Sequence, residues 1–375
     1  MSFKTSIQWC DGTTNPVSAC DGCPLWPGEA VFKSAVAALL KKHVLKPHWA
    51  AIAADLDTLW TATLLPSRKN HVSIFVRSAF AQLAPEVPES LIKEYSDELL
   101  LRLRCYAGAI THRFGGHSKG YPRSFDVPEL FPGRMTEAAA WREPTAADRK
   151  LKPWLIGAKR LIFVSDMGDA LSDSVSFEYL HQEIIQNAAS TNGTRHIFLW
   201  LTKRPARMAH FWHWLDSRQI PWPQNLVPMS SILNAAYAQH ALRLLEIPAM
   251  VRGFSVEPLD NPLVLPEALL ADKPWIIVGG ESGPAANRHP FDLTWARSIR
   301  DQCAAAGAPF FLKQLGSAPI ENGARFRLRN SHGGDWNEWP LDLRLREIPS
   351  VFLKAAECLG SDYIDKRSPI AATGS

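Results

Sequence analysis

The feature of this sequence that most constrains its fold is a rhythm of apolar runs in the second half of the chain. Six runs of strand length each end in polar or glycine residues and lead into a longer segment with helical periodicity. They span residues 160–166, 196–204, 226–232, 251–258, 275–282 and 309–316. The runs are continuously apolar, as in parallel strands that are buried on both faces. The rhythm predicts repeated strand-helix units around one parallel sheet.

Two further features decide which kind of parallel sheet to expect. A short apolar stretch near the N-terminus, SIQW (6–9), is expected to add a seventh strand. No glycine-rich dinucleotide-binding turn follows the first of the runs, which favours an open barrel over a Rossmann sheet. The predicted fold class is α/β: a partial (β/α) barrel of six or seven parallel strands with an inserted helical subdomain.

The insertion is predicted from residues 24–104, which do not share this rhythm. Segments such as WAAIAADLDTLWTATLL and SLIKEYSDELLLRLRC are rich in Ala and Leu at a spacing of three to four, which predicts helices. We therefore expect residues 1–23 to form an N-terminal strand and cysteine loop, and residues 24–104 to form the helical insertion. Residues 105–365 would form the barrel core and a C-terminal extension, and residues 366–375 a disordered tail.

The composition limits the class of protein. The chain has 375 residues, of which 46% are hydrophobic, so a large core can be buried. No apolar run is long enough to span a membrane and the first ten residues lack the apolar region of a signal peptide, so we expect a cytoplasmic protein without a membrane partner. The net charge of +4 permits nucleic-acid binding without requiring it. The six cysteines are expected to be reduced thiols that can bind metal.

Polar side chains end each of the six apolar runs. A parallel (β/α) barrel binds its substrate at the carboxyl ends of its strands, so these residues are the candidate site. Four of them are expected to act catalytically: Asp166, Glu257, Glu281 and Lys313. Others are expected to bind a cofactor: Ser165, Lys203, Arg204, Gly279, Gly280 and Ser282. Polar residues are also needed where a strand leads into a loop, so a purely structural role is the alternative for each of these residues.

Two of these strand ends carry sharper patterns. In GGESG (279–283), two glycines let backbone N–H groups approach a ligand closely, and Glu281 can accept hydrogen bonds from an ammonium or hydroxyl group. In LTKRP (201–205), two adjacent cations suit a carboxylate or a phosphate. A tight strand-to-helix turn and a solvated turn are the respective alternatives.

Three cysteines, Cys20, Cys23 and Cys105, suggest a metal site that the insertion divides. The Cys20-x2-Cys23 pair alone is compatible with half a zinc site, a redox pair or chance. Three thiolates can hold a [4Fe-4S] cluster with one iron left open for S-adenosylmethionine, as in radical enzymes. Zinc prefers four ligands, and no His follows Cys23 at a usual spacing. Because closure entropy grows only logarithmically with loop length, distant cysteines can still meet if the ends of the insertion lie together.

Eight motifs, in the same order along the chain, resemble the phage gp thirty-seven / gp sixty-eight family. They are SIQWCDGTTNPVSAC, CYAGAITHRFGG, FVSDMGD, LTKRPARM, FSVEPL, IIVGGESGPAANRH, RDQCAAAGAPFFLKQLG and HGGDWNEWPLDLR. The resemblance covers the chain outside residues 24–104 and implies a three-cysteine, radical S-adenosylmethionine-like protein. It also implies that Cys20, Cys23 and Cys105 bind the cluster, and that Tyr106, in the Tyr-Ala pair after the last cysteine, contributes to the cofactor site.

The sequence departs from the family pattern at three points. The insertion separates cysteines that lie close together in the family. Cys10 stands where the family commonly has Thr, which makes Cys10 an alternative ligand ranked below the other three. GGESG follows a late strand, whereas the corresponding motif of ordinary radical enzymes follows the second, so Glu281 is expected to serve the substrate and not the cofactor.

These observations lead to one leading interpretation and two alternatives. The leading one is an enzyme that uses a [4Fe-4S] cluster and S-adenosylmethionine to generate a 5′-deoxyadenosyl radical, with an electron donor as partner. Its substrate is unknown, with nucleic acid or a nucleotide as candidates. The first alternative is a non-catalytic, phage-related metal-binding protein that binds nucleic acid or a protein partner through the helical insertion. The second is a degenerate barrel that has lost the cluster.

Overall fold

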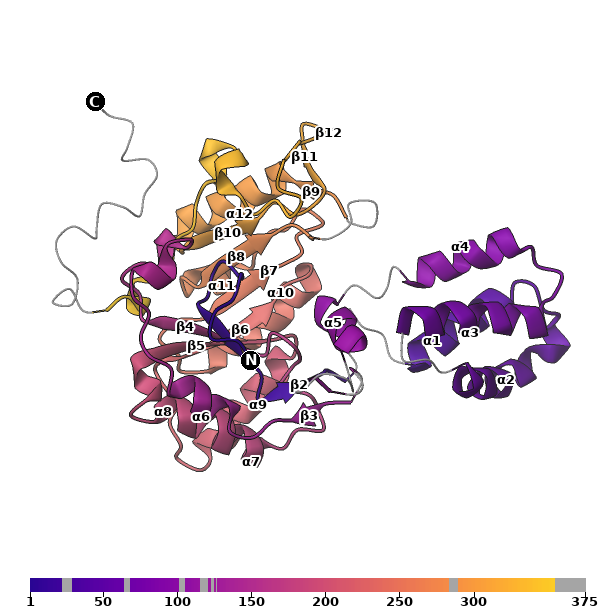
Figure 1. The fold of residues 1–375 in the computed structure, drawn as a ribbon, viewed down its shortest axis with the longest axis horizontal. Helices are drawn as coiled ribbons and strands as arrows, with labels where there is room; N and C mark the ends of the chain where they lie inside the picture. The colour runs from indigo at the N-terminus through magenta and orange to yellow at the C-terminus, as the bar shows by residue number, and fades with distance from the viewer. Residues whose placement is uncertain are drawn as a thin grey trace. The chain divides into compact units, whose positions relative to one another are not determined.

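A computed structural model shows the parallel sheet that the sequence predicts (Figure 1). It describes residues 1–21, 29–63, 68–100, 105–114, 121–122, 125, 127–282 and 289–354. The predictions for Cys23 and for the tail 366–375 lie outside these residues. The chain forms two compact units, which we name the barrel unit (Met1–Pro16 with Phe131–Ser375) and the helical unit (Val17–Leu130).

Seven parallel strands form the sheet of the barrel unit and confirm the predicted fold class. In sheet order they are β1 (Gly12–Thr14), β4 (Arg160–Val164), β5 (His196–Thr202), β6 (Leu226–Ser231), β7 (Gly253–Val256), β8 (Trp275–Gly279) and β10 (Phe310–Gln314). Each connection moves one place along the sheet in the same direction, so the sheet curls into a half-barrel. Each of the six predicted runs contains one of these strands.

The first strand lies elsewhere than expected. Residues 6–9 are not a strand, and the edge strand β1 begins three residues later, at Gly12. The reason is that Lys152 binds the backbone of the loop before β1. Its Nζ donates to the carbonyl oxygens of Thr5 (2.7 Å), Ile7 (2.6 Å) and Cys10 (2.5 Å). Carbonyls that converge on one ammonium group cannot also form a strand ladder.

Helices follow most of the strands and cover the outer face of the sheet. Helix α6 (Arg134–Ala139) precedes β4, and α7 (Phe177–Leu180), a π-helical turn (His181–Ile185) and α8 (Gln186–Ala189) follow it. Helix α9 (Pro205–Asp216) follows β5, and α10 (Ala235–Ala241) with a 3-10 turn (Leu242–Glu246) follows β6. Helix α11 (Glu267–Ala271) follows β7, and α12 (Leu293–Ala306) follows β8. Shorter 3-10 turns are Ala147–Arg149, Pro153–Leu155 and Gly193–Arg195.

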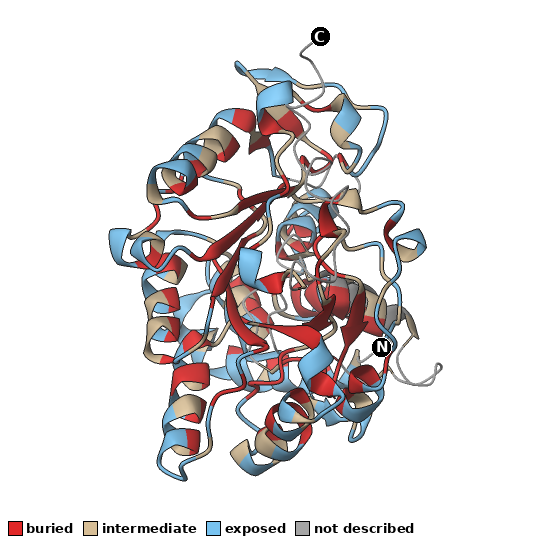
Figure 2. Cartoon of the chain, turned by 90° about the vertical axis from the view of Figure 1, so that its left-hand side faces the viewer, coloured by how far each residue is buried: buried red, intermediate tan, exposed pale blue. Residues whose placement is uncertain are grey.

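Local sequence signals fix the ends of these helices. Asn234 caps α10 by accepting from the N–H groups of Ala236 and Tyr237, and Asp292 caps α12 in the same way. Pro205 occupies the first turn of α9, where its missing N–H costs nothing. Gly307 ends α12 with a φ of 67°, in the left-handed region that favours glycine. Figure 2 shows the result, with buried strands and helices that are buried on one side only.

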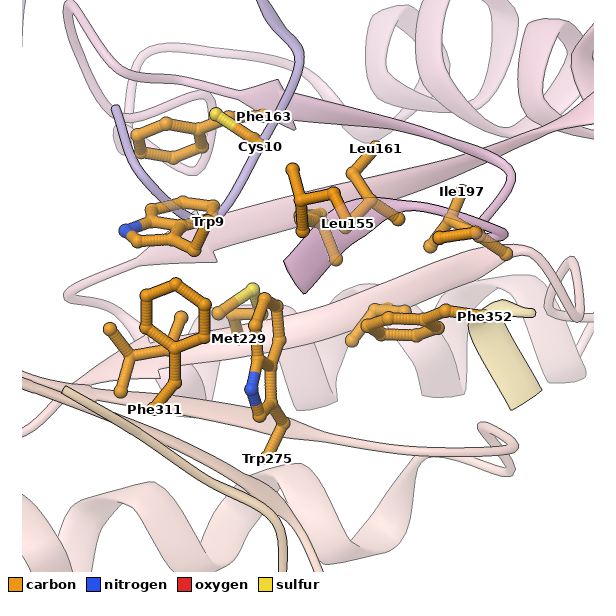
Figure 3. Packing of buried hydrophobic residues seen from close by; sticks show 14 of the residues in the cluster. Trp9, Cys10, Leu155, Leu161, Phe163, Ile197, Met229, Trp275, Phe311 and Phe352 are labelled. Carbon is orange, nitrogen blue, oxygen red and sulfur yellow. The ribbon is translucent and has the colours of Figure 1, made fainter. Parts of the chain in front are cut away.

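A hydrophobic core fills the inside of the curled sheet. Alternate residues of the strands face inward, among them Leu161 and Phe163 of β4 and Ile197 and Leu199 of β5. The N-terminal loop adds Trp9, which packs against Phe163 with a ring-centroid distance of 4.6 Å. Figure 3 shows Trp9 and Cys10 among these inward side chains. The half-barrel is therefore a packed core and not a pore.

The C-terminal segment covers the open edge of the sheet at β10. Phe311 forms an antiparallel bridge with Arg346, and the N–H of Leu312 donates to the oxygen of Leu345. The guanidinium of Arg346 lies 4.0 Å from the ring centroid of Trp154. This segment also includes β11 (Pro319–Glu321), β12 (Ala324–Arg325) and 3-10 turns at Trp336–Glu338, Leu341–Leu343 and Ser350–Phe352. β11 pairs with β9 (Phe291–Asp292), which lies between β8 and α12. Pairing of this kind protects an exposed edge strand.

The helical unit confirms the predicted inserted helical subdomain. It contains α1 (Glu29–Leu40), a 3-10 turn (Lys46–His48), α2 (Trp49–Ala62), α3 (Arg68–Leu83), α4 (Glu89–Leu100) and α5 (Tyr106–Phe114), with an antiparallel pair of β2 (Val17–Ser18) and β3 (Glu129–Leu130). Phe32, Val36 and Leu40 of α1 are buried at a spacing of four, as an amphipathic helix requires. None of the helices in the described part of the chain is long and apolar enough to cross a membrane.

Candidate functional site

The carboxyl ends of the parallel strands bring most of the predicted site residues to one edge of the barrel unit. Because the seven strands run in the same direction, the residues that follow them lie on the same side of the sheet. The residues placed there are Ser165 and Asp166 after β4, Lys203 and Arg204 after β5, Glu257 after β7, Gly279, Gly280, Glu281 and Ser282 at the end of β8, and Lys313 in β10.

Glu257 and Lys313 form an ion pair at this edge. Lys313 Nζ lies 2.9 Å from Glu257 Oε1, and the two side chains are 24% and 14% exposed. Ser255 Oγ donates to Glu257 Oε2 at 3.0 Å, so both carboxylate oxygens have a partner. A Cβ on Gly279 would lie 2.5 Å from Glu257 Oε1. The absence of a side chain at Gly279 therefore makes room for the carboxylate of the pair.

Gly280 serves a different contact. Its N–H donates to the oxygen of Gln314 (3.0 Å), and the side-chain amide of Gln314 donates back to the oxygen of Gly280 (3.0 Å). A Cβ on Gly280 would lie 2.3 Å from the backbone oxygen of Leu315. Close packing of two backbone segments thus accounts for this glycine, and a cofactor contact at Gly279 or Gly280 stays a prediction.

Ser165 and Asp166 lie where β1 and β4 end. Asn15 Nδ2 donates to Asp166 Oδ1 at 2.5 Å, and Asn15 Oδ1 accepts from the N–H of Met167 at 2.9 Å. Burial raises the pKa of Asp166, while the hydrogen bond from Asn15 lowers it. Ser165 has a φ of 75°, a left-handed conformation that costs a non-glycine residue about 1 kcal/mol or more. Strain of this kind is common where a side chain is held for a function.

Acidic residues hold the turn that carries the two cations after β5. The buried carboxylate of Asp169 accepts from Thr202 Oγ1 at 2.8 Å and from the N–H of Lys203 at 3.0 Å. The guanidinium of Arg204 forms an ion pair with Asp173 at 2.8 Å. These contacts fix the turn between β5 and α9. Asp169 and Asp173 lie in the loop after β4, so two adjacent strand ends are joined here.

Glu281 lies at the end of β8 with a side chain that is only 9% exposed. Its Oε2 is 3.3 Å from Nδ1 of His289, a pair that the sequence analysis missed. His289 lies beyond residues 283–288, which the structure does not describe. Ser282 is partly exposed beside Glu281.

The cysteines predicted to bind the cluster belong to the helical unit. Cys20 follows β2, is 6% exposed, and donates its backbone N–H to the oxygen of Phe125 at 2.9 Å. Cys105 immediately precedes α5, which begins at Tyr106. Cys23 and the side chain of Tyr106 lie outside the described residues. Among the described residues, no three His, Cys, Asp or Glu side chains are grouped so that they could hold a metal ion.

Cys10, the alternative ligand, lies in the core of the barrel unit and is fully buried. Burial raises the pKa of its thiol, which disfavours the thiolate that a metal would bind. The structure thus gives Cys10 a packing environment.

Sequence reasoning missed Asn15 and His289, which contact Asp166 and Glu281. The strand before Asn15 was predicted at the wrong position, so the register of this strand against β4, and with it the place of Asn15, could not be deduced.

A comparison with known families matches residues 103–340 to a family model described as "Protein of unknown function (DUF5131)". The match includes strands β4 to β10 and extends over more than half of the chain. No curated protein matches the sequence.

Proposed function

This chain belongs to the family described as "Protein of unknown function (DUF5131)", and we propose that it is a radical S-adenosylmethionine-type enzyme. The observation that carries the proposal is the set of acidic, basic and hydroxyl side chains at the carboxyl ends of an all-parallel half-barrel. Folds of this kind bind and transform their substrates at that edge. The motifs that resemble the phage gp thirty-seven / gp sixty-eight family add the three cysteines.

The chemistry of the cysteines fits a cluster. Thiolates are the ligands that iron-sulfur clusters prefer, and Cys20, Cys23 and Cys105 would supply three. Cys105 precedes the N-terminus of α5, where the positive end of the helix dipole favours a thiolate over a thiol. A bound [4Fe-4S] cluster would supply the electron for reductive cleavage of S-adenosylmethionine to a 5′-deoxyadenosyl radical.

The strand-end residues would orient the substrate. Glu257 is fixed by Ser255 and by Lys313, so its carboxylate is held at one place and can accept a hydrogen bond there. The ammonium of Lys313 has further N–H groups beyond the one directed at Glu257, and these can donate to an oxygen of the substrate. Asp166 is held in the same manner by Asn15. Nucleic acid or a nucleotide remains our proposed substrate class.

Anaerobic purification with iron and sulfide analysis tests the proposal. We expect about four iron atoms per chain, as three-cysteine clusters of this type hold, and release of 5′-deoxyadenosine after reduction in the presence of S-adenosylmethionine. Replacing Cys20, Cys23 or Cys105 by Ser should abolish both. Cys303→Ala is the matched control, because this buried thiol lies in α12 and should leave the iron content unchanged.

Two other outcomes would reject the proposal. Stoichiometric zinc without cleavage of S-adenosylmethionine would support the non-catalytic metal-binding alternative. A protein without metal under anaerobic conditions would support the degenerate barrel. Loss of iron in Cys10→Ala would instead identify Cys10 as the third ligand.

A further inference from the structure

Among the residues that the structure describes, six buried side-chain polar atoms of the barrel unit have no hydrogen-bond partner. Two of them are a donor of the N-terminal loop, the indole Nε1 of Trp9, and a donor at the end of β4, the hydroxyl of Ser165; the two residues are 2% and 6% exposed. A buried polar group without a partner typically costs about 1–3 kcal/mol. Two such costs in one region indicate that a group from outside the chain completes the hydrogen bonds.

Both donors lie toward the carboxyl end of the sheet. Figure 3 shows the indole nitrogen of Trp9 on the side of the ring that points away from Leu155 and Leu161. Leu161 is near the start of β4, so the nitrogen points toward the end of that strand. Ser165 directly follows β4, two residues after Phe163, on which Trp9 packs, and so lies at this same strand end.

Charged groups of the candidate site lie close to these donors. Burial raises the pKa of Cys10, the neighbour of Trp9 in the chain, and the charges of Lys152, Asp11, Asp166 and Lys313 also act on this thiol. Glu257 accompanies Lys313 as its ion-pair partner. Ammonium groups and carboxylates are thus both present in this region, so the charges give no strong preference for an ionic ligand of either sign. The donors and the carboxylates together suit a neutral ligand that accepts and also donates hydrogen bonds.

We propose that the indole N–H of Trp9 and the hydroxyl of Ser165 bind the carbonyl oxygen of a neutral lactam or amide group of the substrate. An N–H of the same group would donate to a strand-end carboxylate, Asp166 or Glu257. A nucleobase and a simple carboxamide share this chemistry. As a substrate subsite this inference rests on the proposed function, but the binding itself needs neither cluster nor S-adenosylmethionine.

The test is a titration of the full-length protein, labelled with ¹⁵N at the indole nitrogens of its 14 Trp residues and followed by NMR. Uracil and acetamide are the two probes. We expect the indole resonance of Trp9 to move saturably, because its N–H acquires an acceptor. The matched control is Trp200, whose buried Nε1 also lacks a partner but whose ring packs on Phe211 of α9, on the outer face of the sheet. Its resonance should stay in place.

Trp9→Phe and Trp200→Phe assign the two resonances. If Trp9→Phe does not fold, a nuclear Overhauser contact with the ring of Phe163 identifies the resonance in the unmodified protein. Ser165→Ala removes the second donor, and Ala and Ser both carry a Cβ, so the left-handed backbone at this position is strained equally in both. The variant should bind the probe that moves the Trp9 resonance about two- to tenfold more weakly. Unchanged resonances of the other indoles would show that this variant is folded.

The outcomes separate the possible ligands. Saturation by uracil alone identifies a nucleobase, and saturation by both probes identifies the amide group in general. A Trp9 resonance that moves with neither probe overturns the inference, as does one that moves with inorganic phosphate, which would indicate an anion site. Because iron is measured separately, a responsive Trp9 in a zinc-containing protein would refute the proposed function and leave the subsite standing.

Discussion

The substitution Asp11→Asn tests whether a buried ion pair holds the N-terminal segment in the barrel unit. Asp11 and Arg149 are 8% and 3% exposed and lie 2.7 Å apart. Asp11 accepts from Nε (2.9 Å) and Nη2 (2.7 Å) of Arg149, and from the N–H of Leu161 in β4 (2.8 Å). Its carboxylate thus connects the residue before β1 to the neighbouring strand. Asn has the same shape but lacks the charge and one of the two acceptor oxygens.

The size of the effect follows from burial. Removing one partner of a buried ion pair typically costs about 3–5 kcal/mol, because the remaining charge is left uncompensated. Arg149 also donates to the carbonyl oxygens of Leu155 (2.5 Å), Ala158 (2.7 Å) and Lys159 (2.7 Å), which keep part of its charge solvated. We therefore expect a loss at the lower end of this range, about 3 kcal/mol in the free energy of unfolding.

Urea denaturation followed by circular dichroism measures the change. The midpoint should fall while the slope stays constant, because the surface exposed on unfolding is the same. The control is Asp301→Asn, which removes a surface partner of Arg300 that is 66% exposed and should change the stability by less than about 0.5 kcal/mol. If Asp11→Asn costs no more than this control, the ion pair does not hold the segment and the reasoning is wrong.

Two further predictions concern backbone packing and pH. Gly280→Ala should destabilise the protein by about 1–3 kcal/mol, because the new Cβ would lie 2.3 Å from the oxygen of Leu315, whereas Gly334→Ala, with nothing within 4 Å, should be tolerated; thermal unfolding compares the two. Asp342→Asn should cost at most about 1 kcal/mol at neutral pH, since Asp342 is partly exposed. A hydrogen bond from Arg297 lowers the pKa of Asp342 below 3.8, so its stabilisation is present above that pH. The difference between variant and wild type should vanish as the pH falls through the lowered pKa, and a difference that persists in acid would contradict this origin.

The candidate site was only partly predictable from sequence. The residues that end each apolar run were predicted correctly to lie at one edge, because parallel strands place their carboxyl ends together. The pairing of Glu257 with Lys313 was not predicted, since it joins strands on either side of β8 across a glycine. Asn15 was missed because β1, the strand before it, begins three residues after the end of the predicted strand. Lys152 holds the preceding residues in a loop through hydrogen bonds to their backbone oxygens.

The sequence by itself determined the class of fold. Apolar runs of strand length alternate with helical segments, and such a pattern can bury its surface only as a parallel sheet with helices outside. Ala- and Leu-rich periodicity likewise determined the helices α1 to α4 that the structure describes between residues 29 and 100. These are local properties, because each depends on residues within a few positions of one another.

Only the tertiary structure decided which polar residues meet, which glycines face a carboxylate or a backbone oxygen, and which buried donors lack a partner. Trp9 and Ser165 are more than 150 residues apart, and no spacing rule brings them to one end of the barrel. Their relation depends on the curl of the sheet and on the path of the N-terminal loop, which follow from the packing of the whole unit.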